Sequence, residues 1–167
     1  MPPGPAARNL RRDFHFLGRT VTAWYFEDFT PGAVIPTVRR TVTEADVMAF
    51  AGLSGDFNVL HTDRIFAAET QFGEPIAHGL LGLSIVSGLM HQTGVINGTI
   101  IAFLGLTWRF TGPVKFGDTI AAEMRVRAAK ETSKPDRGVV TLAFAVTNQR
   151  GERVQDGEFV LMMRRRA

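Results

Sequence analysis

An aspartate and a histidine lie five positions apart in the segment 54–61 (SGDFNVLH), which is bounded by turn-forming residues. If the fold brings them together, the carboxylate of Asp56 and the imidazole of His61 can hold one water molecule and move its protons. A second unusual segment, 77–82 (AHGLLG), follows about seventeen residues later and opens a long apolar run. An acid–base pair followed by a helix that begins with a glycine, Gly79, predicts a small reaction centre.

The pair also has a structural explanation. A loop aspartate commonly accepts hydrogen bonds from its own backbone, and a histidine in the position of His61 can cap the helix that follows. On spacing alone, this structural role is the better explanation of the pair. A catalytic role for Asp56 therefore depends on what the remainder of the chain supplies.

The composition is that of a soluble globular protein. The 167 residues suffice for one domain with a sizeable core, and 45% of them are hydrophobic. The absence of cysteine excludes a disulfide framework, a thiolate metal site and a thiol nucleophile. A net charge of +3 is too small to predict a nucleic-acid partner. The longest apolar run, 79–90, is too short to span a bilayer, and we expect a cytoplasmic protein without a membrane partner.

The N-terminal region differs from the remainder of the chain. Residues 1–20 are rich in proline and arginine, which predicts an N-terminal extension ahead of a single domain at 21–167. Early in that domain, the segment 33–42 is typical of a strand. The proline at position 36 predicts that this strand lies at a sheet edge or contains a bulge.

Three short helical or loop segments are expected next. Thr43 is a typical N-cap, and Gly52 is expected to end the helix that it begins. The segment 56–61 follows as a loop. A further short helix is expected to be capped by Thr62 or Asp63.

The segment 78–91 is apolar on nearly every side, which predicts a long helix that is buried on every face. The pattern then alternates with a period of two, which predicts antiparallel strands around 104–110, 120–128, 140–146 and 155–163. A curved sheet wrapped around the helix is the economical way to bury it. A sheet of about five strands leaves the outer side of the helix uncovered, so a second copy of the chain or the short helices must cover it. We infer an α+β fold, a helix wrapped by a sheet, that dimerises.

Segments 54–61 and 77–80 together resemble the MaoC-like (R)-specific enoyl-CoA hydratase family. The similarity extends from about residue 25 to residue 163. Members of this family have the hotdog fold, an antiparallel sheet around a long central helix, so the resemblance implies that fold. One position departs from the family pattern, because Val59 stands where the family usually has a proline, which would fix the backbone angle φ.

The resemblance implies reversible syn hydration of a trans-2-enoyl thioester to a (3R)-3-hydroxyacyl thioester. It assigns Asp56 as the base that accepts a proton from water, and His61 as the residue that orients this water and takes part in proton transfer. The backbone N–H of Gly79 would stabilise the oxyanion of the thioester, because it lies in the first turn of a helix. A close contact between helix and sheet is the alternative explanation of this glycine.

Three further residues are candidates for substrate binding: Asn58, Ser87 and His78. For Asn58, bonds to the loop backbone are the favoured alternative. For Ser87, a bond to the carbonyl four residues back is equally compatible with the sequence. His78 can equally cap the helix or pack against it. No metal site is expected, and no cofactor beyond the coenzyme A or acyl carrier that forms part of the substrate.

Two other functions remain open. A hotdog acyl-CoA thioesterase would place a carboxylate on or near the long helix, and the segment 79–90 contains none. A non-catalytic subunit of a heteromeric dehydratase would be expected to lack the pair Asp56 and His61. The expected assembly is a homodimer or a dimer-based oligomer that binds an acyl thioester. The sequence leaves the acyl group and its carrier open.

Cationic side chains could meet the phosphates of coenzyme A. The candidates are Arg109, Lys115 and the tail 164–166. For each of them, a solvated surface charge is the better explanation.

Overall fold

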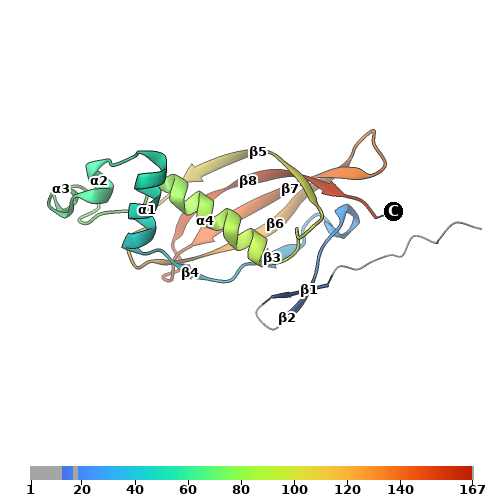
Figure 1. Cartoon of the computed structure of the whole chain (residues 1–167), viewed down its shortest axis with the longest axis horizontal. Coiled ribbons are helices and arrows are strands. Elements are labelled where there is room, and N and C mark those ends of the chain that lie inside the picture. The colour runs from blue at the N-terminus through green and yellow to red at the C-terminus, as the bar shows by residue number, and fades with distance from the viewer. Residues whose placement is uncertain (1–12, 17–18, 167) are drawn as a thin grey trace, which may run out of the picture.

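The computed structural model describes residues 13–16 and 19–166, and its main feature is one antiparallel sheet (Figure 1). The sheet has six strands in the order β3-β6-β7-β8-β5, and β4 also pairs with β6. The strands are β3 (Val34–Pro36), β4 (Arg40–Thr41), β5 (Ile100–Phe110), β6 (Thr119–Glu131), β7 (Arg137–Thr147) and β8 (Arg153–Arg164). The α+β prediction is confirmed. The sheet has six strands because the segment 33–42 forms two short strands on β6, and β3, which contains the proline, lies at the sheet edge.

The helices are η1 (Phe26–Asp28), α1 (Glu44–Ser54), α2 (Val59–Thr62), α3 (Arg64–Ala68) and α4 (Gly79–Gln92). Helix α4 lies on one face of the sheet, α1, α2 and α3 lie at one end, and η1 lies toward the opposite end (Figure 1). The long helix α4 crosses the face of the sheet, and α1, α2 and α3 gather near its N-terminal end. Among the described residues, no helix has both the length and the apolar character that crossing a membrane requires.

The core forms between α4 and the inward side chains of the sheet. The buried residues of α4 recur at helical spacing along one side of the helix. Those of β6 and β7 occur at every second position, as the sequence predicts. They are Leu81, Ile85, Val86, Leu89 and Met90 of α4, Ile120, Ala122, Met124 and Val126 of β6, and Val140, Leu142, Phe144 and Val146 of β7. This packing fixes α4 against the sheet and so places its N-terminus.

The prediction that α4 is buried on every face is wrong for the single chain. A stripe of residues at helical spacing is exposed on its outer side: Leu80, Ser84, Gly88 and His91. Leu80 is 59% exposed. The physical reason is that the sheet covers only one side of the helix, while the short helices lie at its end rather than over its back.

A bulge in β6 and the edge position of β5 make the inward faces of these two strands differ from the predicted ones. In β6 the register shifts between Val126 and Ala128, and Ala129 then packs against the core instead of Ala128. In β5 the register shifts twice before position 105. Of the four side chains predicted on one face of β5, only Trp108 packs against the core, whereas Leu104, Leu106 and Phe110 are about half exposed.

The helix boundaries near the candidate site differ from the predicted ones. Thr43 caps α1 as expected, but Gly52 lies inside the helix. Gly55 ends it, because Gly55 has the left-handed φ of 77° and donates its N–H to the carbonyl of Ala51. Part of the predicted loop 56–61 forms the short helix α2 instead. Asp63, one of the two candidates, caps α3.

The two ends of the described chain lie away from α1, α2 and α3 (Figure 1). The expected extension 1–20 is described only at 13–16 and 19–20, where a hairpin forms from β1 (Asp13–Phe16) and β2 (Arg19–Thr22). Strand β2 therefore crosses the expected domain boundary between residues 20 and 21. At the other end, Arg165 pairs with Glu27 at 2.9 Å, and Arg166 pairs with Asp28, so these arginines bind η1.

Candidate active site

The loop that carries Asp56 is held by hydrogen bonds within the loop. Asp56 directly follows Gly55, the residue that ends α1. Its Oδ1 accepts a hydrogen bond from the N–H of Asn58 at 3.2 Å. The Oδ1 of Asn58 in turn accepts from the N–H of Leu60 at 3.0 Å and so caps α2. These bonds hold the loop although position 59 is a valine and not a proline. They engage Asn58 in bonds to the loop backbone, which is the structural role that the sequence favours for it.

Two histidine rings meet beside Asp56. The Nδ1–H of His61 donates to the carbonyl of Ile76 at 2.7 Å, and the Nε2–H of His78 donates to the backbone carbonyl of Asp56 at 2.8 Å. A carbonyl only accepts, so these nitrogens carry the hydrogens. The two ring centroids are 3.8 Å apart. His78 is 3% exposed, whereas the side chain of Asp56 is 54% exposed. The fold thus gathers both members of the predicted pair around a buried imidazole.

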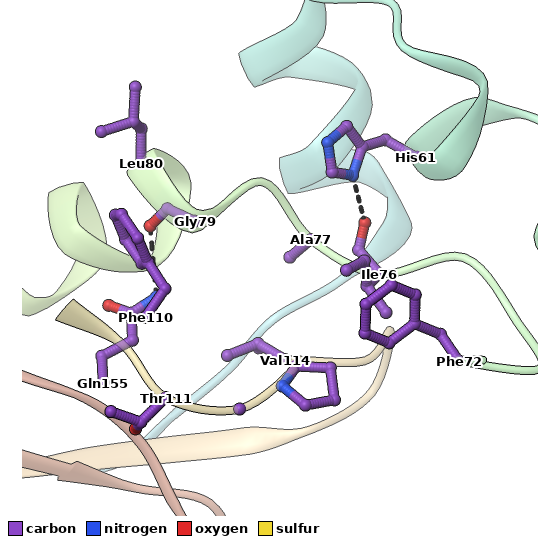
Figure 2. A pocket seen from close by; sticks show the side chains of 12 residues that line it. His61, Phe72, Ile76, Ala77, Gly79, Leu80, Phe110, Thr111, Val114 and Gln155 are labelled. Carbon is purple, nitrogen blue, oxygen red and sulfur yellow. Dashed lines mark hydrogen bonds between the residues drawn. The ribbon is translucent and has the colours of Figure 1, made fainter. Parts of the chain in front are cut away.

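An apolar pocket of about 510 Å³ lies between this pair and the start of α4. Figure 2 shows His61 on one side of the pocket, with Gly79 and Phe110 on the other. Most of the remaining wall is apolar: Phe72, Ile76, Ala77, Leu80, Pro113 and Val114. None of the described side chains that line the pocket is an aspartate, glutamate, lysine or arginine. The pocket therefore suits an uncharged, apolar group whose reactive end meets His61.

Gly79 is the first residue of α4, and its N–H has no acceptor among the described residues. Donors at this position have no partner within the helix, and the helix dipole is positive there. A side chain at position 79 would bring its Cβ to 2.8 Å from the ring of Phe110. The close contact between helix and sheet is therefore present. Because Gly79 has no side chain, a ligand in the pocket can also approach its N–H.

Gln155 is a pocket residue that the sequence analysis did not identify. It is 2% exposed, and its amide links Trp108 of β5 to the carbonyl of Gly79. One signal was present in the sequence: Gln155 is in phase with Phe159 and Leu161, which point into the core. A polar residue in the inward phase of an apolar strand indicates a buried hydrogen-bonding role.

The family model for the MaoC-like domain matches residues 28–148. The chain belongs to the MaoC-like domain family. It is 42% identical to the (R)-specific enoyl-CoA hydratase of Aeromonas caviae over 119 residues, which cover 71% of this chain and 84% of that protein. It is 43% identical to Protein MaoC of Klebsiella aerogenes over 127 residues, or 75% of this chain, but these span only 37% of that longer protein.

Solved structures agree with this family assignment. The monoamine oxidase regulatory protein of "Archaeoglobus fulgius" has a TM-score of 0.81 and 42% identity, with 87% of this chain and 97% of that one covered. A Mycobacterium tuberculosis protein with a double hotdog fold has a TM-score of 0.76 over 86% of this chain and 44% of that one. At 21% identity, this second similarity concerns the fold alone. The predicted hotdog fold is confirmed.

Of the predicted site residues of this MaoC-like domain, His61 and Gly79 line the pocket, whereas Asp56, Asn58, Ser87 and His78 lie outside its wall. Ser87 lies two turns along α4 from Gly79, and its hydroxyl makes no hydrogen bond to any described residue, so it does not bond the carbonyl four residues back. His78 lies behind His61 and not among the residues that line the pocket. Substrate contacts by Ser87 and His78 stay predictions.

The candidate phosphate ligands are engaged elsewhere. Arg109 donates to Asp156 at 2.7 Å, and Lys115 donates to Glu74 at 2.8 Å. Arg165 and Arg166 of the tail bind η1, as described above. These ion pairs agree with the surface role that the sequence favours for each cation.

The fold also gathers a possible metal-ligand set that the sequence spacing does not show. One atom each of Asp56, His61 and His78 lie within 4.8 Å of one another. Two of the four ring nitrogens, however, are bound to backbone carbonyls. The rings also face each other with a tilt of 32°, whereas metal ligands point their nitrogens at a common centre. This geometry favours acid–base chemistry over metal binding.

Proposed function

We propose that this chain catalyses the reversible syn hydration of a trans-2-enoyl thioester to a (3R)-3-hydroxyacyl thioester. One observation carries the proposal: His61 and Gly79 line the same apolar pocket, and a carboxylate oxygen of Asp56 lies within 4.8 Å of a ring nitrogen of His61. Hydration needs a base for water and a donor for the thioester oxygen, and these groups supply them. The name of the Aeromonas caviae relative, an (R)-specific enoyl-CoA hydratase, supports this assignment.

The proposed reaction begins with one water molecule held between Asp56 and His61. Because Nδ1 of His61 donates to Ile76, the neutral ring presents Nε2 as an acceptor for a hydrogen of this water. Asp56 accepts the other hydrogen as the oxygen attacks C3 of the substrate. The electron pair of the double bond moves toward the thioester oxygen, which receives a hydrogen bond from Gly79.

The proton held by Asp56 then passes to C2 on the same face of the substrate, and the thioester carbonyl forms again. The sum of the two steps adds one water molecule to the double bond. No oxidant, reductant or separate cofactor is required, because coenzyme A or an acyl-carrier group arrives with the substrate. The assignment of Asp56, His61 and Gly79 as catalytic groups is part of this proposal.

The test is turnover of crotonyl-CoA, followed by the loss of the absorbance of the conjugated thioester. We expect hydration without release of free thiol. Release of free coenzyme A from a saturated acyl-CoA would instead indicate the thioesterase alternative. A purified chain that consumes no enoyl-CoA across a range of chain lengths, alone or with a second subunit, would contradict the proposal.

We propose further that the working molecule is a homodimer. Strand β5 is a sheet edge that pairs only with β8 in the described chain, and it exposes Phe103, Leu104, Leu106 and Phe110. Leu80 on the outer stripe of α4 adds to this apolar surface. Monomers rarely leave such edges and patches uncovered. Leu80 and Phe110 also line the pocket, so a second copy would complete its rim.

The remaining expectations fit this function. We propose a role in fatty-acid metabolism and a cytoplasmic location, in keeping with an acyl thioester as the substrate and with the absence of cysteine. Asn58, Ser87 and His78 are proposed to support the site from around the pocket. His78 is best placed to do so through Asp56 and His61, which it contacts directly.

A further inference from the structure

Gln155 joins three elements at the back of the pocket. Its side chain is buried between β5, β8 and α4, where an unpaired amide would be costly. The Nε1–H of Trp108 donates to its Oε1 at 3.1 Å, and its own Nε2–H donates to the carbonyl of Gly79 at 3.2 Å. The Trp108 bond orients the amide, so that the nitrogen faces α4 and the oxygen faces β5.

The helix is shaped to accept this amide. A Cβ atom at position 82 would collide with the amide nitrogen of Gln155 and would lie 3.1 Å from its oxygen. Gly82 is buried, and it is the residue that lets the amide lie flat against the first turn of α4. Gln155 and Gly82 therefore form a matched pair.

The bond to Gly79 acts on the part of α4 that faces the pocket. In a helix the carbonyl of the first residue already accepts one N–H from the next turn. A second donor from β8 fixes the peptide plane between residues 79 and 80 relative to the sheet. The first turn, which carries the open N–H of Gly79, is thereby held at one distance from the pair on the opposite side of the pocket. An apolar side chain would fill the same space without fixing this plane.

We propose that Gln155 is a positioning residue for the oxyanion donor of Gly79, oriented by Trp108 and accommodated by Gly82. This inference rests on the proposed hydratase function. Gln155 is not assigned to the thioester oxygen in this proposal, because its amide is bound to Trp108 through Oε1 and to the Gly79 carbonyl through one hydrogen of Nε2. Its contribution concerns the transition state, in which the charge on the oxygen is largest, more than the binding of the substrate.

The test compares Gln155→Met with wild type, because methionine keeps the length of the side chain and removes both hydrogen bonds. We expect kcat for crotonyl-CoA to fall about tenfold to a hundredfold, with little change in KM. The reason is that the N–H of Gly79 would be displaced from its position but not removed. Binding of butyryl-CoA, a saturated analogue that builds up no charge, should stay near the wild-type value. Trp108→Phe, which frees the amide to rotate, should lower kcat in the same direction by a smaller factor.

Asn148→Ala is the matched control. Asn148 is also a buried amide, but it binds Glu152 and Arg150 in the turn between β7 and β8 and does not line the pocket. We expect this variant to lose thermal stability and to retain kcat. A merely structural role for Gln155 predicts the same behaviour for Gln155→Met.

Wild-type kcat in folded Gln155→Met would overturn the inference while leaving the hydratase proposal intact. If that variant does not fold, Trp108→Phe decides, and unchanged kcat in it would equally overturn the inference. A wild-type chain without hydratase activity would instead refute the proposed function.

Discussion

The two ring nitrogens of His61 differ: Nδ1 binds the protein, and Nε2 is the one proposed to bind the catalytic water. The carbonyl of Ile76, at 2.7 Å, fixes the hydrogen on Nδ1 and leaves Nε2 for the water. His61→Asn retains a donor near the Nδ1 position and removes the ring nitrogen that faces water. We expect kcat to fall about 100-fold or more, with a small change in the melting temperature. His61→Asn with wild-type kcat would exclude proton handling by this ring.

Asp56 and Asp63 offer a matched pair of acidic residues. Asp56→Asn removes the base, and we expect a loss of kcat on the order of 100-fold to 10,000-fold in a folded protein. The Oδ1 of Asp63 accepts from the N–H groups of Ile65 and Phe66, and an asparagine can accept the same bonds. Asp63→Asn should therefore retain both activity and stability. Equal activity losses in the two variants would point to a general effect of charge and not to a base.

The sequence was sufficient to predict that the pair and the glycine lie near one another, because the resemblance places them on adjacent segments, and their catalytic roles stay predictions. It was not sufficient for His78 and Gln155. The position of the His78 ring against His61 follows from how α2 and the start of α4 pack together. The link from Gln155 to Gly79 joins residues 76 positions apart, and it exists only once β8, β5 and α4 are assembled.

At the scale of elements, substituting alanine for each of two helical glycines should change the free energy of unfolding in opposite directions. Gly52 is exposed in α1 with no atom within 4 Å of an added Cβ, so Gly52→Ala should raise the free energy of unfolding by about 1 kcal/mol. Gly82→Ala should lower it by about 1–3 kcal/mol, because the methyl group meets the amide of Gln155. Urea unfolding of both variants measures the two effects. A stabilising Gly82→Ala would show that the amide is free to move away.

The turn before β6 depends on a buried carboxylate. Burial alone would raise the pKa of Asp118, but hydrogen bonds from the backbone N–H of Lys115 and from Gln149 and Arg150 hold its pKa below the ordinary value. Its stabilisation is therefore complete above the unfolded pKa of about 3.9 and is lost as pH falls through the lower folded pKa. We expect the stability difference between wild type and Asp118→Asn to be large near pH 7 and to shrink below about pH 4. A pH-independent difference in urea unfolding would contradict this account.

The types of the elements and the inward faces of β6 and β7 could be predicted from the sequence, because the periodicity of apolar residues reflects burial. The end of α1 and the inward face of β5 could not be predicted in this way. Gly52 and Gly55 are equivalent as helix terminators in the sequence, and only the backbone angle of Gly55 distinguishes them. A bulge adds one residue without a compositional mark, so the alternation in β6 loses its phase where the register shifts. In β5, Leu106, Trp108 and Phe110 follow both register shifts and keep one phase, but Leu106 and Phe110 are exposed because this strand lies at the sheet edge.

At the scale of the whole molecule, the outer stripe of α4 and the edge of β5 are the exposed surfaces that the proposed dimer would cover. Wild type should have a native mass of twice the 18.4 kDa chain. Leu106→Lys places a charge on the apolar edge, and we expect it to shift the protein toward monomer and to lower activity. Val38→Lys, a comparably exposed position beside β3, should stay dimeric. A monomeric and fully active wild type would refute the dimer proposal.

Hydration of crotonyl-CoA in deuterated water is the sharpest test of the proposed pair, because the product records from which side each group was added. We expect the 3R alcohol, with deuterium at C2 and oxygen at C3 added to the same face and with no free coenzyme A. The same reaction should be almost absent in Asp56→Asn. A 3S alcohol, or addition to opposite faces, would contradict a single water held between Asp56 and His61 and facing Gly79.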